Sequence, residues 1–365
     1  MYIPSDIVSR YHPGPLLGLG PGVFQCFIIA SVTPLFLLHQ VCSPYYDPRC
    51  RFAGPTPFAK SCLEKKGERR ILMSSSKIIH GIVGASAAGL VAVHALPNLF
   101  PDQMVKRYAV PEVQVSGVVK STFEDVAKKM DVENPGKVKL FINNGYGTLC
   151  VGSTQLPGGA AIGVSKTFLY NNLDELENAG VTFKGKKLNW RSKFGKSFSE
   201  VLLLGEDELK FVLAHELSHV KSWDFTTNCF LPAWCLYFTY RAIPIIVSAL
   251  PPVNPLVKFT IQASLWAASY WIYVQENVSL HHKREFLADT SAAMVGLPYV
   301  NGGIAVTLKR MKMNTILRGL CGEEGTKRYS IEGNDLKDWA HPKLTERLRK
   351  LEDIYVEYYL TDAKL

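Results

Sequence analysis

One stretch of the chain reads Glu208-Leu209-Lys210-Phe211-Val212-Leu213-Ala214-His215-Glu216-Leu217-Ser218-His219 and contains an HExxH motif on a segment of helical character. Residues four apart on a helix share one face, so His215 and His219 can hold one metal ion together. Glu216 lies one step round the helix, where it can act as a general base on water. The motif therefore predicts a Zn²⁺ site with hydrolytic chemistry. A surface helix with two unrelated histidines is the alternative.

A second candidate element follows at Arg284-Glu285-Phe286-Leu287-Ala288-Asp289. Glu285 and Asp289 share a face of the predicted helix, so Glu285 can supply the third protein ligand that a catalytic zinc site usually has. Asp289 can accept the outer N–H of a ligating histidine and so fix its tautomer. An ordinary charged helix face would carry the same acids, and the position after HExxH favours the metal site.

Three apolar stretches approach the ~20 residues that a membrane-spanning helix needs, and they are Ile78 to Leu96, Cys229 to Leu250, and Leu256 to Val274. Only Pro251-Pro252-Val253-Asn254-Pro255 joins the last two, so both ends of this hairpin must emerge on one side of a bilayer. A cation in mid-span is costly unless it faces protein or water. Because of Arg241, a hairpin that dips into the membrane or packs on the protein is the alternative to a full crossing.

Residues 1–72 differ from the rest, with nine of the 21 prolines and half of the eight cysteines. The apolar segment Val23 to Val41, interrupted by Pro34, fits a signal-like segment, a weak span or a processed leader. Met73 leads directly into the first apolar stretch, so translation from Met73 is an equal hypothesis. No cysteine pair has CxxC spacing, and we expect neither a disulfide framework nor a cysteine zinc site.

The net charge of +9 does not indicate nucleic acid, because the cations are dispersed and no DNA- or RNA-binding signature is present. One basic run has no acid within it: Lys184, Lys186, Lys187, Arg191, Lys193 and Lys196. It predicts a solvated loop of a polar hairpin over Phe183 to Ser199, or a patch for anionic lipid headgroups.

From Phe100 onward the pattern is that of a globular domain. A helix is expected over Ser121 to Met130, and another over Glu208 to Ser222, opened by acids that favour the helix dipole. Short strands are expected over Val138 to Ile142, Leu149 to Val151, and Ala160 to Val164. The mixture predicts an α+β fold.

Together with HExxH, the residues Asp224, Glu285-Phe286-x-Ala288-Asp289, His341-Pro342 and Arg347 resemble the M48 family of zinc metallopeptidases. The resemblance covers roughly Val138 to Leu351, with gaps. It implies that His215, His219 and Glu285 are the zinc ligands and that Glu216 is the base. Asp289 and Asp224 would support the ligands, and His341 and Arg347 would contact the substrate or the developing oxyanion. The strand near Gly159 to Val164 would be the sheet edge to which a peptide adds.

A second resemblance covers about Ile78 to Asn334 and rests on Leu99-Phe100-Pro101-Asp102, Gly159 to Leu169, Trp190-Arg191-Ser192 and Glu208 to Ser222. These segments are similar to the transmembrane protein 177 family, of which this chain would be a member with the metal site retained. The family begins near Met73 of this chain. The resemblance implies the mitochondrial inner membrane and a role in assembly of cytochrome c oxidase subunit 2. The membrane of the endoplasmic reticulum is the alternative location for this chain.

Taken together, the sequence predicts an α+β, gluzincin-like metallopeptidase domain in two parts, residues 100–228 and 275–365. A transmembrane helix at 73–99 precedes it, and a membrane hairpin at 229–274 lies between the two metal-binding helices. The predicted function is zinc-dependent hydrolysis of peptide bonds in membrane or membrane-associated proteins. The alternative is a non-catalytic assembly factor whose partners are cytochrome c oxidase assembly components.

Overall fold

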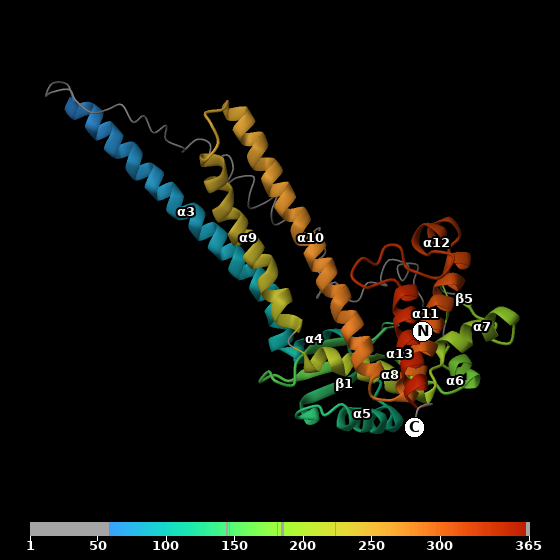
Figure 1. Ribbon diagram of the computed structural model, residues 1–365. Coiled ribbons are helices and arrows are strands. Elements are labelled where there is room, and N and C mark those ends of the chain that lie inside the picture. Colours follow the sequence, from blue (N-terminus) through green and yellow to red (C-terminus); the bar gives the residue numbers. More distant parts are fainter. Residues whose placement is uncertain are drawn as a thin grey trace. The chain divides into compact units, whose positions relative to one another are not determined.

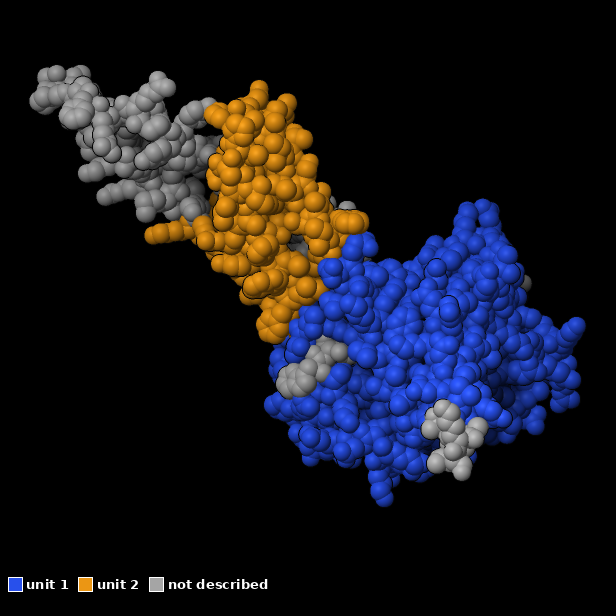
Figure 2. Space-filling model, viewed as in Figure 1, with its two compact units in different colours: residues 1–18, 94–228, 275–365 blue, residues 19–93, 229–274 orange. Residues whose placement is uncertain are grey.

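The computed structural model describes residues 58–143, 145, 147–180, 182–183, 186–222 and 224–362 (Figure 1). The apolar segment Val23 to Val41, with the rest of residues 1–57 of the expected leader, lies outside the described residues. The chain forms two compact units (Figure 2). Residues 94–228 and 275–365 belong to unit 1, and residues 19–93 and 229–274 belong to unit 2.

Unit 2 is helical in its described part. It contains most of α3 (Phe58–Leu99) and α9 (Asp224–Ser248), and the first half of α10 (Pro255–Ala293). A small apolar cluster joins the three helices inside this unit, with Leu90 from α3, Ala233 and Leu236 from α9, and Trp266 and Tyr270 from α10.

Among the described residues, two helical segments are long and apolar enough to cross a membrane, Lys77–Leu99 and Phe225–Ser248. They coincide with the first two expected spans. The third expected span, Leu256 to Val274, is helical as part of α10 but does not reach the same apolarity. Lys258 and Gln262 interrupt its apolar character, which accounts for the difference.

Unit 1 contains a three-stranded sheet in the order β1-β3-β2. The central strand β3 (Ala160–Ser165) pairs in parallel with β1 (Val138–Asn143) and antiparallel with β2 (Leu149–Gly152). All residues of β3 are buried. The expectation that Gly159 to Val164 forms a sheet edge is therefore wrong, because this strand has a neighbour on each side and β1 and β2 are the edges.

Helix α8 (Glu206–Lys221) carries the HExxH motif, and α11 (Leu297–Leu320) packs closely against its first half. A Cβ added at Gly302 would lie 2.0 Å from the Asp207 carbonyl oxygen. A Cβ at Gly303 would lie 2.6 Å from the Phe211 ring. Only glycine allows this approach, so the two glycines determine how α11 supports α8. The main core joins these helices to α5 (Gly117–Lys129) and β3.

The prediction of a polar hairpin over Phe183 to Ser199 is confirmed only for the first half of this segment. The short strands β4 (Thr182–Phe183) and β5 (Lys186–Lys187) pair antiparallel, but α7 (Lys193–Leu202) is a helix. Ser192 caps it by accepting a hydrogen bond from the Gly195 N–H. Phe198 on the inner face of α7 packs into a second apolar cluster.

The helix expected over Ser121 to Met130 corresponds to α5, and the three expected strands correspond to β1, β2 and β3. The remaining described elements are α4 (Pro101–Tyr108), η1 (Pro135–Lys137), η2 (Lys166–Leu169), α6 (Leu173–Asn178), α12 (Gly322–Arg328) and α13 (Leu344–Asp362). Helix α13 packs on α11 and brings the C-terminal part of the chain to the HExxH helix.

Candidate metal centre

Three potential ligands converge in unit 1: His215 and His219 from α8, and Glu285 from α10. The Nε2 atoms of the two histidines lie 3.3 Å apart. Glu285 places one carboxylate oxygen 3.6 Å from His215 Nε2 and the other 3.4 Å from His219 Nε2. Zinc bonds of about 2.0–2.1 Å in tetrahedral geometry separate neighbouring ligand atoms by roughly 3.4 Å. These three side chains, called the triad below, therefore fit a zinc ion in donor type and in spacing.

Asp289 holds His215 in the orientation that the triad requires. The Nδ1 atom of His215 lies 2.8 Å from Asp289 Oδ1. Donation of the Nδ1–H to this carboxylate leaves the lone pair on Nε2, which faces the triad. Asp289 also accepts two hydrogen bonds from Arg347 on α13, at 2.7 Å from Nε and 2.6 Å from Nη2. Burial alone would raise the pKa of Asp289, but Arg347 and His215 outweigh it and lower the value to about 2.

Arg347 also reaches the triad directly, with its Nη1 atom 3.3 Å from Glu285. Burial by itself raises the pKa of Glu285, yet the hydrogen bond from His219 and nearby positive charge hold it well below the ordinary value. Glu285 is thus ionised at neutral pH, as a metal ligand must be. The guanidinium of Arg347 is buried between two carboxylates, so its position is fixed by charge pairing.

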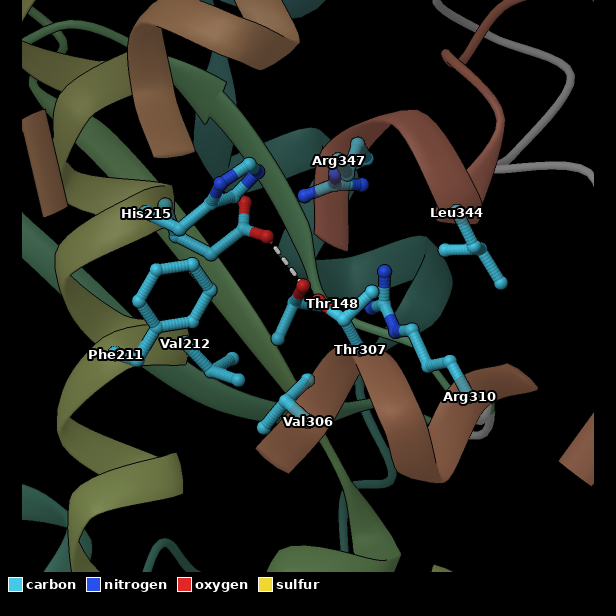
Figure 3. A pocket seen from close by; sticks show the side chains of 10 residues that line it. Thr148, Phe211, Val212, His215, Val306, Thr307, Arg310, Leu344 and Arg347 are labelled. Carbon is cyan, nitrogen blue, oxygen red and sulfur yellow. Dashed lines mark hydrogen bonds between the residues drawn. The ribbon is translucent and has the colours of Figure 1, made fainter. Parts of the chain in front are cut away.

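Glu216 projects beside the triad from the same helix. Its carboxylate accepts a hydrogen bond from the Thr148 hydroxyl, which lies just before β2 (Figure 3). Glu216 and Asp289 are both buried, but their surroundings differ. Asp289 is paired with Arg347, whereas Glu216 faces a pocket. A carboxylate held next to a metal site and facing a pocket is suited to proton transfer.

His341 lies close to the triad in a loop before α13. Its Nδ1 atom is 2.9 Å from an Asp338 oxygen, and its Nε2 atom is 3.9 Å from Glu285. Burial lowers the pKa of His341, but Asp338 and Glu285 raise it more, so the net shift is upward. The loop is held to α10 by a hydrogen bond that His282 Nε2 donates to the Trp339 carbonyl at 3.1 Å. The contact with Asp338 thus orients the ring so that Nε2 lies on the side of the metal site.

A pocket of about 320 Å³, which includes space open to solvent, adjoins Glu216 (Figure 3). Its walls come from α8, α11, α13 and the loop before β2. The lining residues are Thr148, Phe211, Val212, His215, Glu216, Val306, Thr307, Arg310, Leu344 and Arg347.

The structure brings together His215, His219, Glu216, Glu285, Asp289, His341 and Arg347, all of which the sequence singled out. Asp224 begins α9, but its side chain lies outside the described part of the chain. Sequence reasoning missed Thr148, Asp338 and Arg310. The spacing of Asp338 and His341 was an available signal, because an acid three residues before a histidine can orient the ring. Thr148 gave none.

Two histidines on one helix, a carboxylate from a later helix and a further carboxylate beside them are the residue types that zinc metallopeptidases use to hold the metal and to transfer protons. Residues 116–355 match the description Peptidase family M48, and the chain belongs to this family.

The chain is also similar to proteins named transmembrane protein 177. It is 28% identical to the one of Homo sapiens over 264 residues, which cover 70% of this chain and 84% of the human protein. It is 29% identical to the Rattus norvegicus protein over 68% of this chain and 82% of that protein. The Xenopus laevis protein is 23% identical over 73% of this chain and 88% of its own length. No solved structure shows a significant match to this chain. The names of these relatives and the two apolar helices support membrane association.

Proposed function

We propose that this chain is a membrane-anchored zinc metalloendopeptidase that hydrolyses peptide bonds of membrane or membrane-associated proteins. The observation that carries the proposal is the spacing of the triad, in which the two histidine Nε2 atoms lie 3.3 Å apart and each lies 3.4 or 3.6 Å from one oxygen of the Glu285 carboxylate. Membership of peptidase family M48 supports the reaction class, and the apolar helices support the membrane anchor.

In this proposal the triad holds zinc, which when bound polarises the scissile carbonyl and makes water a better nucleophile. Glu216 takes the proton of the attacking water and passes it to the leaving amine. Thr148 keeps the Glu216 carboxylate in place through its hydrogen bond. His341, oriented by Asp338, donates to the oxygen that becomes negative in the transition state. Arg347 acts through Asp289 and Glu285, although it also lines the pocket and can contact the substrate.

The substrate chain adds to strand β2 in this proposal. Strand β2 is an edge of the sheet, and Thr148 directly before it contacts Glu216. An extended peptide that pairs with an edge strand obtains main-chain hydrogen bonds regardless of its sequence. Pairing along β2 would carry the peptide past the general base, which the central strand β3 cannot do.

The proposal predicts about one zinc ion per chain in purified protein. His219→Ala should abolish zinc binding, because it removes one of three ligands. Glu216→Gln should keep the zinc and lose hydrolysis, because Glu216 is proposed as a base and does not belong to the triad. Metal content measured by mass spectrometry, beside cleavage of an unfolded membrane-protein substrate, checks both statements. A wild-type chain that stays metal-free after incubation with zinc would refute the proposal.

The second candidate is a non-catalytic assembly factor for cytochrome c oxidase subunit 2 in the mitochondrial inner membrane. The observation that favours it is the similarity to transmembrane protein 177 over 70% of the chain. In that case the triad would bind metal for structural reasons or would be a remnant, and the partners would be other assembly components. A membrane of the endoplasmic reticulum is the alternative location.

A further inference from the structure

Arg310 carries a charged group without a partner beside the general base. Its side chain extends from α11 toward Thr148 and lines the same pocket as Glu216 (Figure 3). The side chain of Arg310 is exposed to solvent, and across the described ranges of the chain it takes part in no hydrogen bond or ion pair. Helix α11 contains no aspartate or glutamate, so no residue along the helix can neutralise it.

The other donors that line the pocket are already engaged. Thr148 donates to Glu216, and the Thr307 hydroxyl donates to the Gly303 carbonyl at 2.8 Å. Arg347 is paired with Asp289. Of the donor side chains lining this pocket in the described structure, Arg310 is thus the one that has no partner within the protein. The remaining walls are mainly apolar, from Phe211, Val212, Val306 and Leu344.

The position of Glu216 indicates which part of a substrate enters this pocket. If Glu216 delivers a proton to the leaving amine, that nitrogen must lie within hydrogen-bond reach of its carboxylate. The leaving amine belongs to the residue that follows the scissile bond. Because Glu216 forms part of the pocket wall, that residue would lie beside the pocket, where its side chain can enter.

We propose that Arg310 determines specificity by binding a carboxylate on the residue that follows the scissile bond. A guanidinium can bind a carboxylate through two parallel hydrogen bonds, which combine charge with geometry. The carboxylate belongs to a glutamate or aspartate side chain, or to the C-terminus of a substrate that ends at this residue. Glu216 would repel a second carboxylate, so the ligand must lie on the Arg310 side of the pocket. This inference rests on the proposed peptidase function.

Binding to the zinc-loaded, detergent-solubilised Glu216→Gln chain tests the inference without the need for hydrolysis. The probes are fluorescent peptides of alanine and leucine with a single internal Glu or Gln and an amidated C-terminus. A third peptide has neither residue and ends in a free carboxylate, with its amide as the control. We expect one carboxylate peptide to bind about tenfold more tightly than its neutral partner, as a charge-assisted hydrogen bond predicts. The favoured pair identifies the source of the carboxylate.

Variants at two arginines separate specific recognition from general charge attraction. Arg310→Gln should abolish the preference, whereas Arg349→Gln should retain it, because Arg349 is exposed on α13 and does not line the pocket. Arg310→Glu should shift the preference toward a peptide with lysine. Equal affinity of each carboxylate peptide and its neutral partner, or a preference that survives Arg310→Gln, overturns the inference.

Cleavage by the wild-type chain distinguishes failure of the inference from failure of the proposed function. Cleavage on the N-terminal side of Glu, or release of the last residue, supports both. Cleavage elsewhere, with no preference in binding, refutes the role of Arg310 and leaves the peptidase intact. A carboxylate preference that depends on Arg310 without any cleavage supports the binding site and refutes the peptidase.

Discussion

Asp289 links the two halves of the metal centre. It is almost fully buried, at 1% exposure, and it pairs with His215 on one side and Arg347 on the other. The burial of the Asp289 carboxylate destabilises the fold little only while His215 and Arg347 both remain. Without its partners, a buried charge destabilises a protein by several kcal/mol. The residue therefore contributes to both metal affinity and stability.

The substitution Asp289→Asn should weaken zinc binding by roughly 10–100-fold, because the ring of His215 loses its charged hydrogen-bond acceptor. Zinc affinity measured by competition with a chelator checks this expectation. Asp353→Asn is a matched control, since Asp353 is exposed on α13 and away from the triad. Equal zinc affinity in Asp289→Asn and wild type would show that Asp289 does not support the ligand.

At the scale of residues, the sequence predicted those contacts that a single helix places together. His215 and His219 share one face of α8, and Glu285 and Asp289 share one face of α10, because both pairs are four residues apart. Thr148 and Asp338 come from loops, and their approach to Glu216 and His341 depends on how the elements pack. No local pattern carries that information.

At the scale of elements, the packing of α11 on α8 depends on two glycines. Gly302→Ala should destabilise unit 1 by about 1–3 kcal/mol or more, since its Cβ would overlap the Asp207 carbonyl oxygen and the helices must separate. Gly319→Ala on the same helix is the control, because a Cβ there meets no atom within 4 Å. It should be neutral or stabilising by up to ~1 kcal/mol from helix propensity. Thermal unfolding of both variants checks the contrast, and equal melting temperatures would contradict it.

The hairpin of α9 and α10 permits a test of topology. The link between these helices is short, so Thr227 and Asn277 should face the same compartment, with Asn254 on the opposite side if the hairpin crosses. Single cysteines at these positions, labelled from each side of sealed vesicles, report their accessibility. Arg241 is exposed on α9, which makes a full crossing costly unless another surface covers it. Labelling of all three positions from one side would show that the hairpin does not cross.

Two errors of the sequence analysis lie at this scale. The segment from Gly159 to Val164 was correctly predicted to contain a strand, but it was wrongly placed at the edge of the sheet. The order of the strands depends on the parallel pairing of β1 with β3, which are separated in the sequence by β2. The segment from Lys193 to Ser199 is helical despite its polar composition. Phe194 and Phe198 are one helical turn apart and stack at 5.8 Å, and Ser192 supplies the cap, so local signals for α7 were present.

At the scale of the whole molecule, two comparisons support different functions. Membership of peptidase family M48 and the complete triad favour chemistry. The similarity to transmembrane protein 177 covers 84% of the human protein, and it favours a role that those relatives share. Both candidate functions are compatible with zinc, because a metal can stabilise a fold without catalysing a reaction. The presence of bound zinc therefore cannot decide between them.

The substitution Glu216→Gln separates the two functions in cells. Glu216 is buried and held by Thr148, and glutamine has nearly the same shape, so the variant should remain folded and correctly located. If hydrolysis is the function, Glu216→Gln should behave like a deletion, since only the base is lost. If binding alone is the function, the variant should restore a deletion strain fully. Assembly of cytochrome c oxidase is the readout that the second candidate calls for, with His219→Ala as a parallel variant that removes a ligand. Full rescue by Glu216→Gln would refute the peptidase proposal even in a chain that binds zinc.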